Sequence, residues 1–77
     1  MKELVEFMAK AMVDNPEQLE VNEIAGRDTS VIELKVAKED IGKIIGKKGR
    51  NVQAMRLILN AASAKLRKRV ALEIIDQ

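Results

Sequence analysis

The chain has 77 residues, of which 47% are hydrophobic, so its length and composition suit one small globular domain. It contains neither histidine nor cysteine, which excludes disulfides, thiolate zinc sites and the commonest general base and activated nucleophile of enzymes. No stretch reaches the roughly 18 apolar residues that a membrane-spanning helix needs. We therefore expect one domain over residues 1–77, with no catalytic activity and no cofactor, and a cytoplasmic location.

Charge is distributed unevenly along the chain, although the net charge is only +2. Residues 1–40 hold ten acidic and five basic side chains, whereas residues 41–72 hold nine basic side chains and no acidic one. A helix surface that only faces solvent usually carries both acidic and basic side chains. A stretch of this length with only basic side chains attracts an anion. The pattern therefore indicates a polyanionic partner for the second half of the chain.

The first half of the chain predicts one helix and two strands. Apolar residues at helical spacing predict an amphipathic helix over 2–13, which Asn15-Pro16 should end. Residues 19–25 and 31–37 are predicted strands, and the second alternates apolar with charged side chains as a half-buried strand does. Between them, residues 26–30 have the composition of a hairpin turn.

The second half predicts two helices and a final strand. Asp40 is placed to cap a short helix over 41–45, and residues 50–67 form the longest predicted helix. Residues 70–75 then predict the last strand. The resulting order, α-β-β-α-α-β, predicts a two-layer α+β fold in which helices cover one face of a three-stranded sheet.

The segment Gly46-Lys47-Lys48-Gly49 lies between the two predicted helices of the second half. Two glycines let the backbone turn sharply and approach a ligand with no Cβ in the way. The following helix should begin with N–H groups that lack an intrahelical acceptor, and such groups favour phosphate. Lys47 and Lys48, with Lys43 and Arg50 beside them, add formal positive charge. The alternative is a plain helix–helix turn, but such a turn needs only one left-handed glycine.

The stretch Ile44-Ile45-Gly46-Lys47-Lys48-Gly49-Arg50-Asn51-Val52 resembles the signature of KH domains, in which aliphatic residues flank a G-x-x-G loop. The aliphatic pattern continues at Met55, Ile58 and Leu59, and Gly42 precedes it. Together with the element order, the chain resembles a type II KH domain. Over essentially its whole length it resembles the small stand-alone bacterial KH RNA-binding proteins of the KhpA family.

This resemblance implies that the loop clamps the backbone of about four nucleotides of single-stranded RNA, with bases in a groove walled by two helices and strand 31–37. It also implies an RNA chaperone or post-transcriptional regulator that influences cell elongation and division through transcripts. The near-lack of aromatic residues argues against RRM and OB-fold binding, in which aromatics stack the bases. The expected RNA-binding residues are Gly42, Lys43, Ile45, Gly46, Lys47, Lys48, Gly49, Arg50, Asn51 and Val52.

Other motifs in the basic half carry less information. A P-loop fails because Gly42 and Gly46 are one residue too close and Lys48 stands where Ser or Thr should bind magnesium. No cluster has the spacing of metal ligands. The run Arg67-Lys68-Arg69 either caps the long helix and solubilises the surface, or contacts an extended RNA.

The long helix carries two predicted apolar stripes. We expect the first to face the sheet; it consists of Val52, Met55, Ile58, Leu59, Ala62 and Leu66. The second, on roughly the opposite side, consists of Ala54, Leu57, Ala61 and Ala64. It either packs on the N-terminal helix or stays exposed as an interface. The resemblance implies a homodimer, or a heterodimer with a larger KH-containing protein of the KhpB type. A module that binds only protein through this stripe is the alternative to RNA binding.

Overall fold

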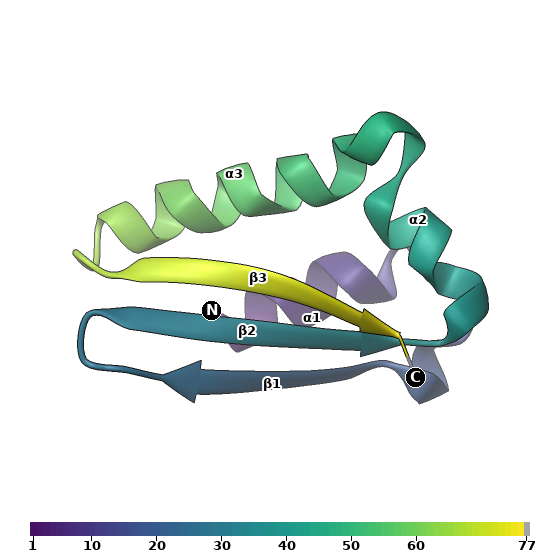
Figure 1. Cartoon of the computed structure of the whole chain (residues 1–77), viewed down its shortest axis with the longest axis horizontal. Helices are drawn as coiled ribbons and strands as arrows, with labels where there is room; N and C mark the ends of the chain where they lie inside the picture. Colours follow the sequence, from purple (N-terminus) through teal and green to yellow (C-terminus); the bar gives the residue numbers. More distant parts are fainter. Residues whose placement is uncertain (77) are drawn as a thin grey trace.

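The computed structural model describes residues 1–76, and its helices and strands follow the order α-β-β-α-α-β (Figure 1). The helices lie together on one face of the sheet, so the predicted two-layer α+β fold is confirmed. The elements are α1 (Lys2–Lys10), β1 (Glu20–Ala25), β2 (Thr29–Val36), α2 (Ile41–Ile45), α3 (Arg50–Ala64) and β3 (Arg69–Asp76), with short 3-10 turns η1 (Pro16–Gln18), η2 (Lys38–Asp40) and η3 (Lys47–Gly49).

The three strands form one mixed sheet in the order β1-β2-β3. β1 and β2 are antiparallel and joined by the predicted short hairpin, in which the Gly26 N–H donates to the carbonyl oxygen of Thr29 at 2.7 Å. β2 and β3 are parallel, because the chain between them crosses back over the sheet as α2 and α3. β2 is therefore the central strand and β3 is an edge strand that lies next to α3.

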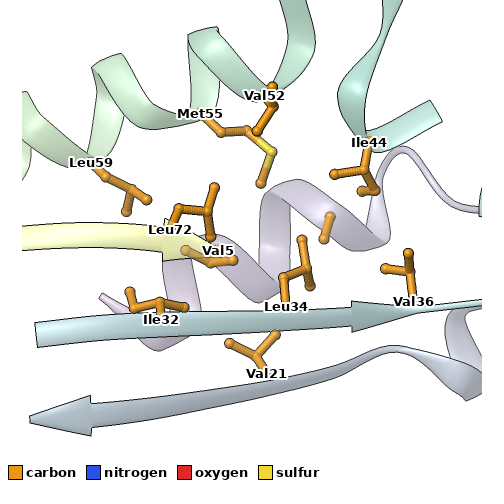
Figure 2. Close-up of a cluster of buried hydrophobic side chains, with 11 residues drawn as sticks. Val5, Val21, Ile32, Leu34, Val36, Ile44, Val52, Met55, Leu59 and Leu72 are labelled. Atoms are coloured by element: carbon orange, nitrogen blue, oxygen red, sulfur yellow. The ribbon is translucent and has the colours of Figure 1, made fainter. Parts of the chain in front are cut away.

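The hydrophobic core lies between the sheet and the three helices (Figure 2). Alternate residues of β2 point into it, as the apolar–charged alternation predicts. Each fully buried aliphatic side chain stabilises the fold by about 1.5–3 kcal/mol. The buried core consists of Val5, Ala9, Val21, Ile32, Leu34, Val36, Ile44, Val52, Met55, Leu59 and Leu72.

Two helices end earlier than predicted. α1 stops at Lys10 rather than residue 13, and the backbone N–H groups of Asp14 and Asn15 bond to the buried carboxylate of Asp40 instead of continuing the helix. α3 stops at Ala64 rather than residue 67, because Arg67 takes a left-handed conformation with φ of 55°. The strands differ less from the prediction: β2 begins at Thr29 and β3 spans two more residues than expected.

The helical stripe predicted to face the sheet is only partly correct. Val52, Met55 and Leu59 are buried, but Ile58 is 46% exposed and Leu66 is 62% exposed. Leu66 lies beyond the end of α3, in the turn that leads to β3, so it cannot follow the helical periodicity. None of the helices in residues 1–76 is long and apolar enough to cross a membrane.

Candidate nucleic-acid interface

The backbone of the loop between α2 and α3 takes conformations that favour glycine. Gly46 has φ and ψ of 75° and 172°, and Gly49 has φ of 73°, so both glycines have positive φ. Lys48, between them, is also left-handed, with φ of 57°. Three of four consecutive residues therefore lie where side chains are disfavoured. This explains why the turn uses two glycines, which a plain helix–helix turn does not need.

Gly46 is required for space as well as for conformation. A Cβ on Gly46 would lie 2.6 Å from Cγ of Asn51, whereas one on Gly49 would meet no heavy atom closer than 3.9 Å. The Asn51 side chain occupies this position because its Nδ2 donates a hydrogen bond of 2.8 Å to the carbonyl oxygen of Lys43. Asn51 thus links the first turn of α3 to α2 across the loop.

The amide groups of the loop are less available than the sequence indicates. The N–H of Gly46 donates to the Gly42 carbonyl at 2.8 Å, and the N–H of Gly49 donates to the Gly46 carbonyl at 3.0 Å. The N–H of Arg50, which begins α3, donates to Lys47. The N–H of Arg50, the first of α3, is therefore paired, contrary to the sequence prediction. Side-chain charge can attract an anion at this loop independently of these three amides.

That charge is present and accessible. Lys47, Lys48 and Arg50 are exposed, and none of them forms an ion pair with any residue in the described part of the chain. Three cations without counter-charges around a fixed loop produce a local positive potential. The loop can therefore hold an anion through these three side chains.

Lys43 differs from its three neighbours because it already has acidic partners. Its Nζ lies 2.6 Å from Oδ2 of Asp14 and 3.5 Å from Oδ1 of Asp40. The hydrogen bond to Asp14 raises the pKa of Lys43, against an opposing effect of partial burial, and Asp40 adds to the rise. Lys43 therefore stays charged, but this charge is shared with two carboxylates rather than free for phosphate.

Asp40 is a buried carboxylate whose burial the sequence did not indicate. Burial acts to raise the pKa of Asp40, but hydrogen bonds from Asp14 and Asn15, together with the charge of Lys43, hold that pKa below its ordinary value. The donors are the N–H of Asp14 at 3.2 Å and the N–H and Nδ2 of Asn15 at 3.0 and 3.1 Å. Asp40 is the N-cap residue of α2, as predicted, but its side chain makes no capping bond to that helix. It instead fastens the connection after α1 to the start of α2.

The predicted wall for bases is only partly in place. Gly42 and Ile45 are exposed on α2, and within residues 1–76 no heavy atom outside the helix backbone and neighbouring residues of Gly42 lies within 4 Å of a Cβ built on it. Val52 is only 7% exposed and belongs to the core. Strand 31–37 corresponds to β2, the central strand, whose helix-facing apolar side chains are also in the core. The strand beside α3 with a free edge is β3, whereas β2 lies in the middle of the sheet.

The second predicted stripe of α3 is exposed. Ala54, Leu57, Ala61 and Ala64 all face solvent, with Leu57 70% exposed, so the alternative that they pack on α1 is wrong. Sequence reasoning missed two apolar side chains on the same side of the molecule, Ile58 and Phe7. Both border a hollow of about 300 Å³ between α1 and α3, and Ala54 lies at its margin. In residues 1–76, no group of acidic side chains is arranged to hold a metal ion.

Comparison with known proteins identifies the family. The family model for the KH domain of KhpA and KhpB matches residues 2–74. The chain belongs to the KhpA/KhpB family of KH domains. The residues Gly46–Gly49 are thus the G-x-x-G loop of a KH domain, and the resemblance found in the sequence is confirmed.

Three relatives of this KH protein, each called RNA-binding protein KhpA, illustrate the similarity. The chain is 59% identical over 75 residues to the protein from Caldanaerobacter subterraneus subsp. tengcongensis, which covers 97% of this chain and 100% of the relative. It is 52% identical, with the same coverage, to the protein from Clostridium perfringens. It is 49% identical to that of Aquifex aeolicus, over 99% of this chain and 96% of the relative. No solved structure matches the chain.

Proposed function

We propose that this chain binds single-stranded RNA by holding its sugar-phosphate backbone at the loop Gly46–Gly49. The observation that carries the proposal is the pair Lys47 and Lys48, both exposed and without ion-pair partners among residues 1–76, on a loop whose glycines fix its shape. The relatives named as RNA-binding proteins support it. So does the concentration of positive charge in residues 41–72.

In the proposed mechanism, one set of residues contacts the phosphates and another contacts the bases. Lys47, Lys48 and Arg50 attract phosphates, and the positive-φ glycines let the strand approach the backbone closely. Bases then lie against Gly42 and Ile45 and along the free edge of β3. Lys43 and Asn51 support the loop rather than contact phosphate. The Lys43 side chain pairs with Asp14, and the Asn51 side chain bonds the first turn of α3 to α2. No chemical step is part of this function.

Salt dependence tests this function directly. We expect an unstructured oligouridylate to bind, and the logarithm of its affinity to fall linearly with the logarithm of salt concentration. Three phosphate contacts predict a slope near −2, from about 0.7 per contact. Fluorescence anisotropy between low and physiological salt measures it. An affinity that does not change with salt concentration, or the absence of binding at low salt, would contradict the proposal.

The biological setting follows from this mode of binding. Contacts to phosphate carry little sequence information, so the protein should act on many RNAs, as a chaperone or post-transcriptional regulator. We propose that residues 1–77 form a single KH domain, with the family match over residues 2–74 in support, and that it works in the cytoplasm.

We also propose that the exposed stripe of α3 is a protein interface. A single KH site binds few nucleotides, and pairing two sites raises affinity through effective concentration. The stripe is apolar and solvent-facing around Leu57, and its alanines permit close approach of a second helix. A second copy of this chain, or a larger KH-containing protein of the KhpB type, would cover it.

Replacing Ala61 with Glu tests the interface. A charge placed in the stripe should lower the apparent mass in light scattering from about twice the 8.6 kDa of one chain to about once. Ala25→Glu, at an exposed position in β1, is the matched control and should keep the dimer. An unchanged mass for Ala61→Glu, or a monomeric unmodified protein, would reject a homodimer at this surface.

A further inference from the structure

A second group of cations lies at the opposite end of α3 from the loop. Lys65, Arg67, Lys68 and Arg69 are all exposed, and none forms an ion pair with any other residue of the part that the structure describes. The fourteen residue steps of α3 separate this group from the loop by about 21 Å. Figure 1 shows the two regions at the two ends of α3, with β3 running beside the helix between them.

The C-terminus of α3 does not need these cations as caps. The N–H of Lys68 donates to the carbonyl of Ser63 at 3.3 Å, and the N–H of Arg67 donates to that of Ala64 at 3.2 Å. This is the backbone pattern of a Schellman motif, which satisfies the last carbonyls without side chains. Its left-handed position, usually glycine, is here occupied by Arg67 with φ of 55°. A capping role therefore does not explain the cluster.

The cluster borders a hollow rather than a flat surface. A cavity of about 560 Å³ opens between the last turn of α3 and the first residues of β2 and β3. Lys68 and Arg69 line it together with the neutral polar residues Thr29, Asn60 and Ser63. Among residues 1–76, no acidic side chain lines it. Two cations and several hydrogen-bonding groups around one hollow are the chemistry that a phosphate or a ribose needs.

Positive charge also continues between the two ends of α3. Arg56 lies between the loop and the cluster, and its guanidinium donates a hydrogen bond of 3.0 Å to the carbonyl oxygen of Leu72 in β3. This contact holds a cation beside the edge of β3, with no carboxylate paired to it within residues 1–76. A polyanion that leaves the loop and follows α3 and β3 would therefore meet cations along its path.

We propose that Lys68 and Arg69, with the hollow between them and Thr29, form a distal site that holds phosphates of an RNA strand already bound at the loop. The loop of a KH domain engages about four nucleotides, so only a longer RNA can reach this second site. The inference rests on the proposed RNA-binding function. It adds that affinity depends on RNA length through these two side chains.

The test compares two variants on two RNA lengths. Lys68→Gln with Arg69→Gln removes the distal charges, and Lys2→Gln with Lys10→Gln on α1 removes the same amount of charge elsewhere. Oligouridylates of about five and about fifteen nucleotides serve as short and long probes. For each RNA length, the affinity of the variant is divided by the affinity of the unmodified protein. The long RNA offers more binding positions to both proteins, so this ratio removes that difference between the two lengths.

We expect the distal variant to lose about five- to tenfold in affinity for the long RNA, and to lower its salt slope by about 1.4, with little change for the short RNA. The α1 control should change both lengths equally and slightly. Thermal unfolding checks that the variants are folded, and Lys68→Gln alone, which leaves β3 untouched, repeats the test outside a strand with about half the change in salt slope.

The two proposals fail in different ways. If the unmodified protein binds neither RNA, the proposed function itself is wrong. If it binds both, but the distal variants weaken both equally or neither, the loop site stands and the distal site is rejected.

Discussion

Replacement of both Lys47 and Lys48 by Asp is expected to weaken RNA binding by roughly 100- to 1,000-fold. The change removes two attractions and creates two repulsions at about 4 Å, each worth about 1 kcal/mol in water. Both side chains are exposed and have no ion-pair partners among the described residues, so stability should change by less than about 0.5 kcal/mol. Anisotropy titration with oligouridylate and thermal unfolding measure the two effects.

A charge-matched control separates this local effect from a change in net charge. Lys2→Asp with Lys38→Asp alters the total charge equally, and both positions begin helical segments, where an acid is tolerated. It should cost RNA affinity far less than the loop variant. Equal losses for the two variants would mean that overall charge, not the loop, attracts RNA.

Gly46→Ala is expected to be the most damaging single substitution in the loop, with a loss of about 3 kcal/mol or more in the free energy of unfolding. The backbone region of Gly46 alone disfavours a side chain by about 1–3 kcal/mol, and the new Cβ would collide with Asn51. Gly49→Ala is the matched comparison. It has a similar φ but an open surrounding, so it should cost only about 1–2 kcal/mol. Urea denaturation measures both.

Part of the steric cost can be isolated by repeating Gly46→Ala in an Asn51→Ala background. Alanine lacks the Cγ and Nδ2 of Asn51, which lie 2.6 and 2.8 Å from the new Cβ, and keeps only the Cβ contact at 2.9 Å, so the cost of Gly46→Ala should fall while the backbone part remains. If Gly46→Ala costs the same in both backgrounds, or no more than Gly49→Ala, the close packing of Asn51 on Gly46 is not what requires glycine there.

The fold and the loop were predictable because their signals are local. The alternation in β2 and the two glycines around two lysines are each visible within eight residues or fewer. The predicted order of elements and the sheet with helices on one face follow from such local patterns. The cations of the proposed interface, Lys47, Lys48 and Arg50, could be predicted for the same reason.

Features that depend on distant residues were missed. Asp40 precedes a helix and so resembles a cap, but its hydrogen-bond donors lie 25 and 26 positions earlier. The ion pair of Lys43 with Asp14, 29 positions earlier, was not visible in the sequence. Ile58 follows helical spacing toward the core, but a helix lying along the edge strand buries only a narrow stripe. The hydrogen bonds of the glycine N–H groups could not be predicted, because their acceptors depend on the conformation of the turn.

The parallel pairing of β2 with β3 has a consequence for how this family can diverge. Two adjacent parallel strands need a long crossover between them, and here that crossover is the segment α2–loop–α3. A descendant that no longer needed RNA could change the lysines of the loop freely. It could not delete the segment, because the sheet would then lose its third strand. Selection on the architecture alone therefore preserves the segment that carries the loop Gly46–Gly49.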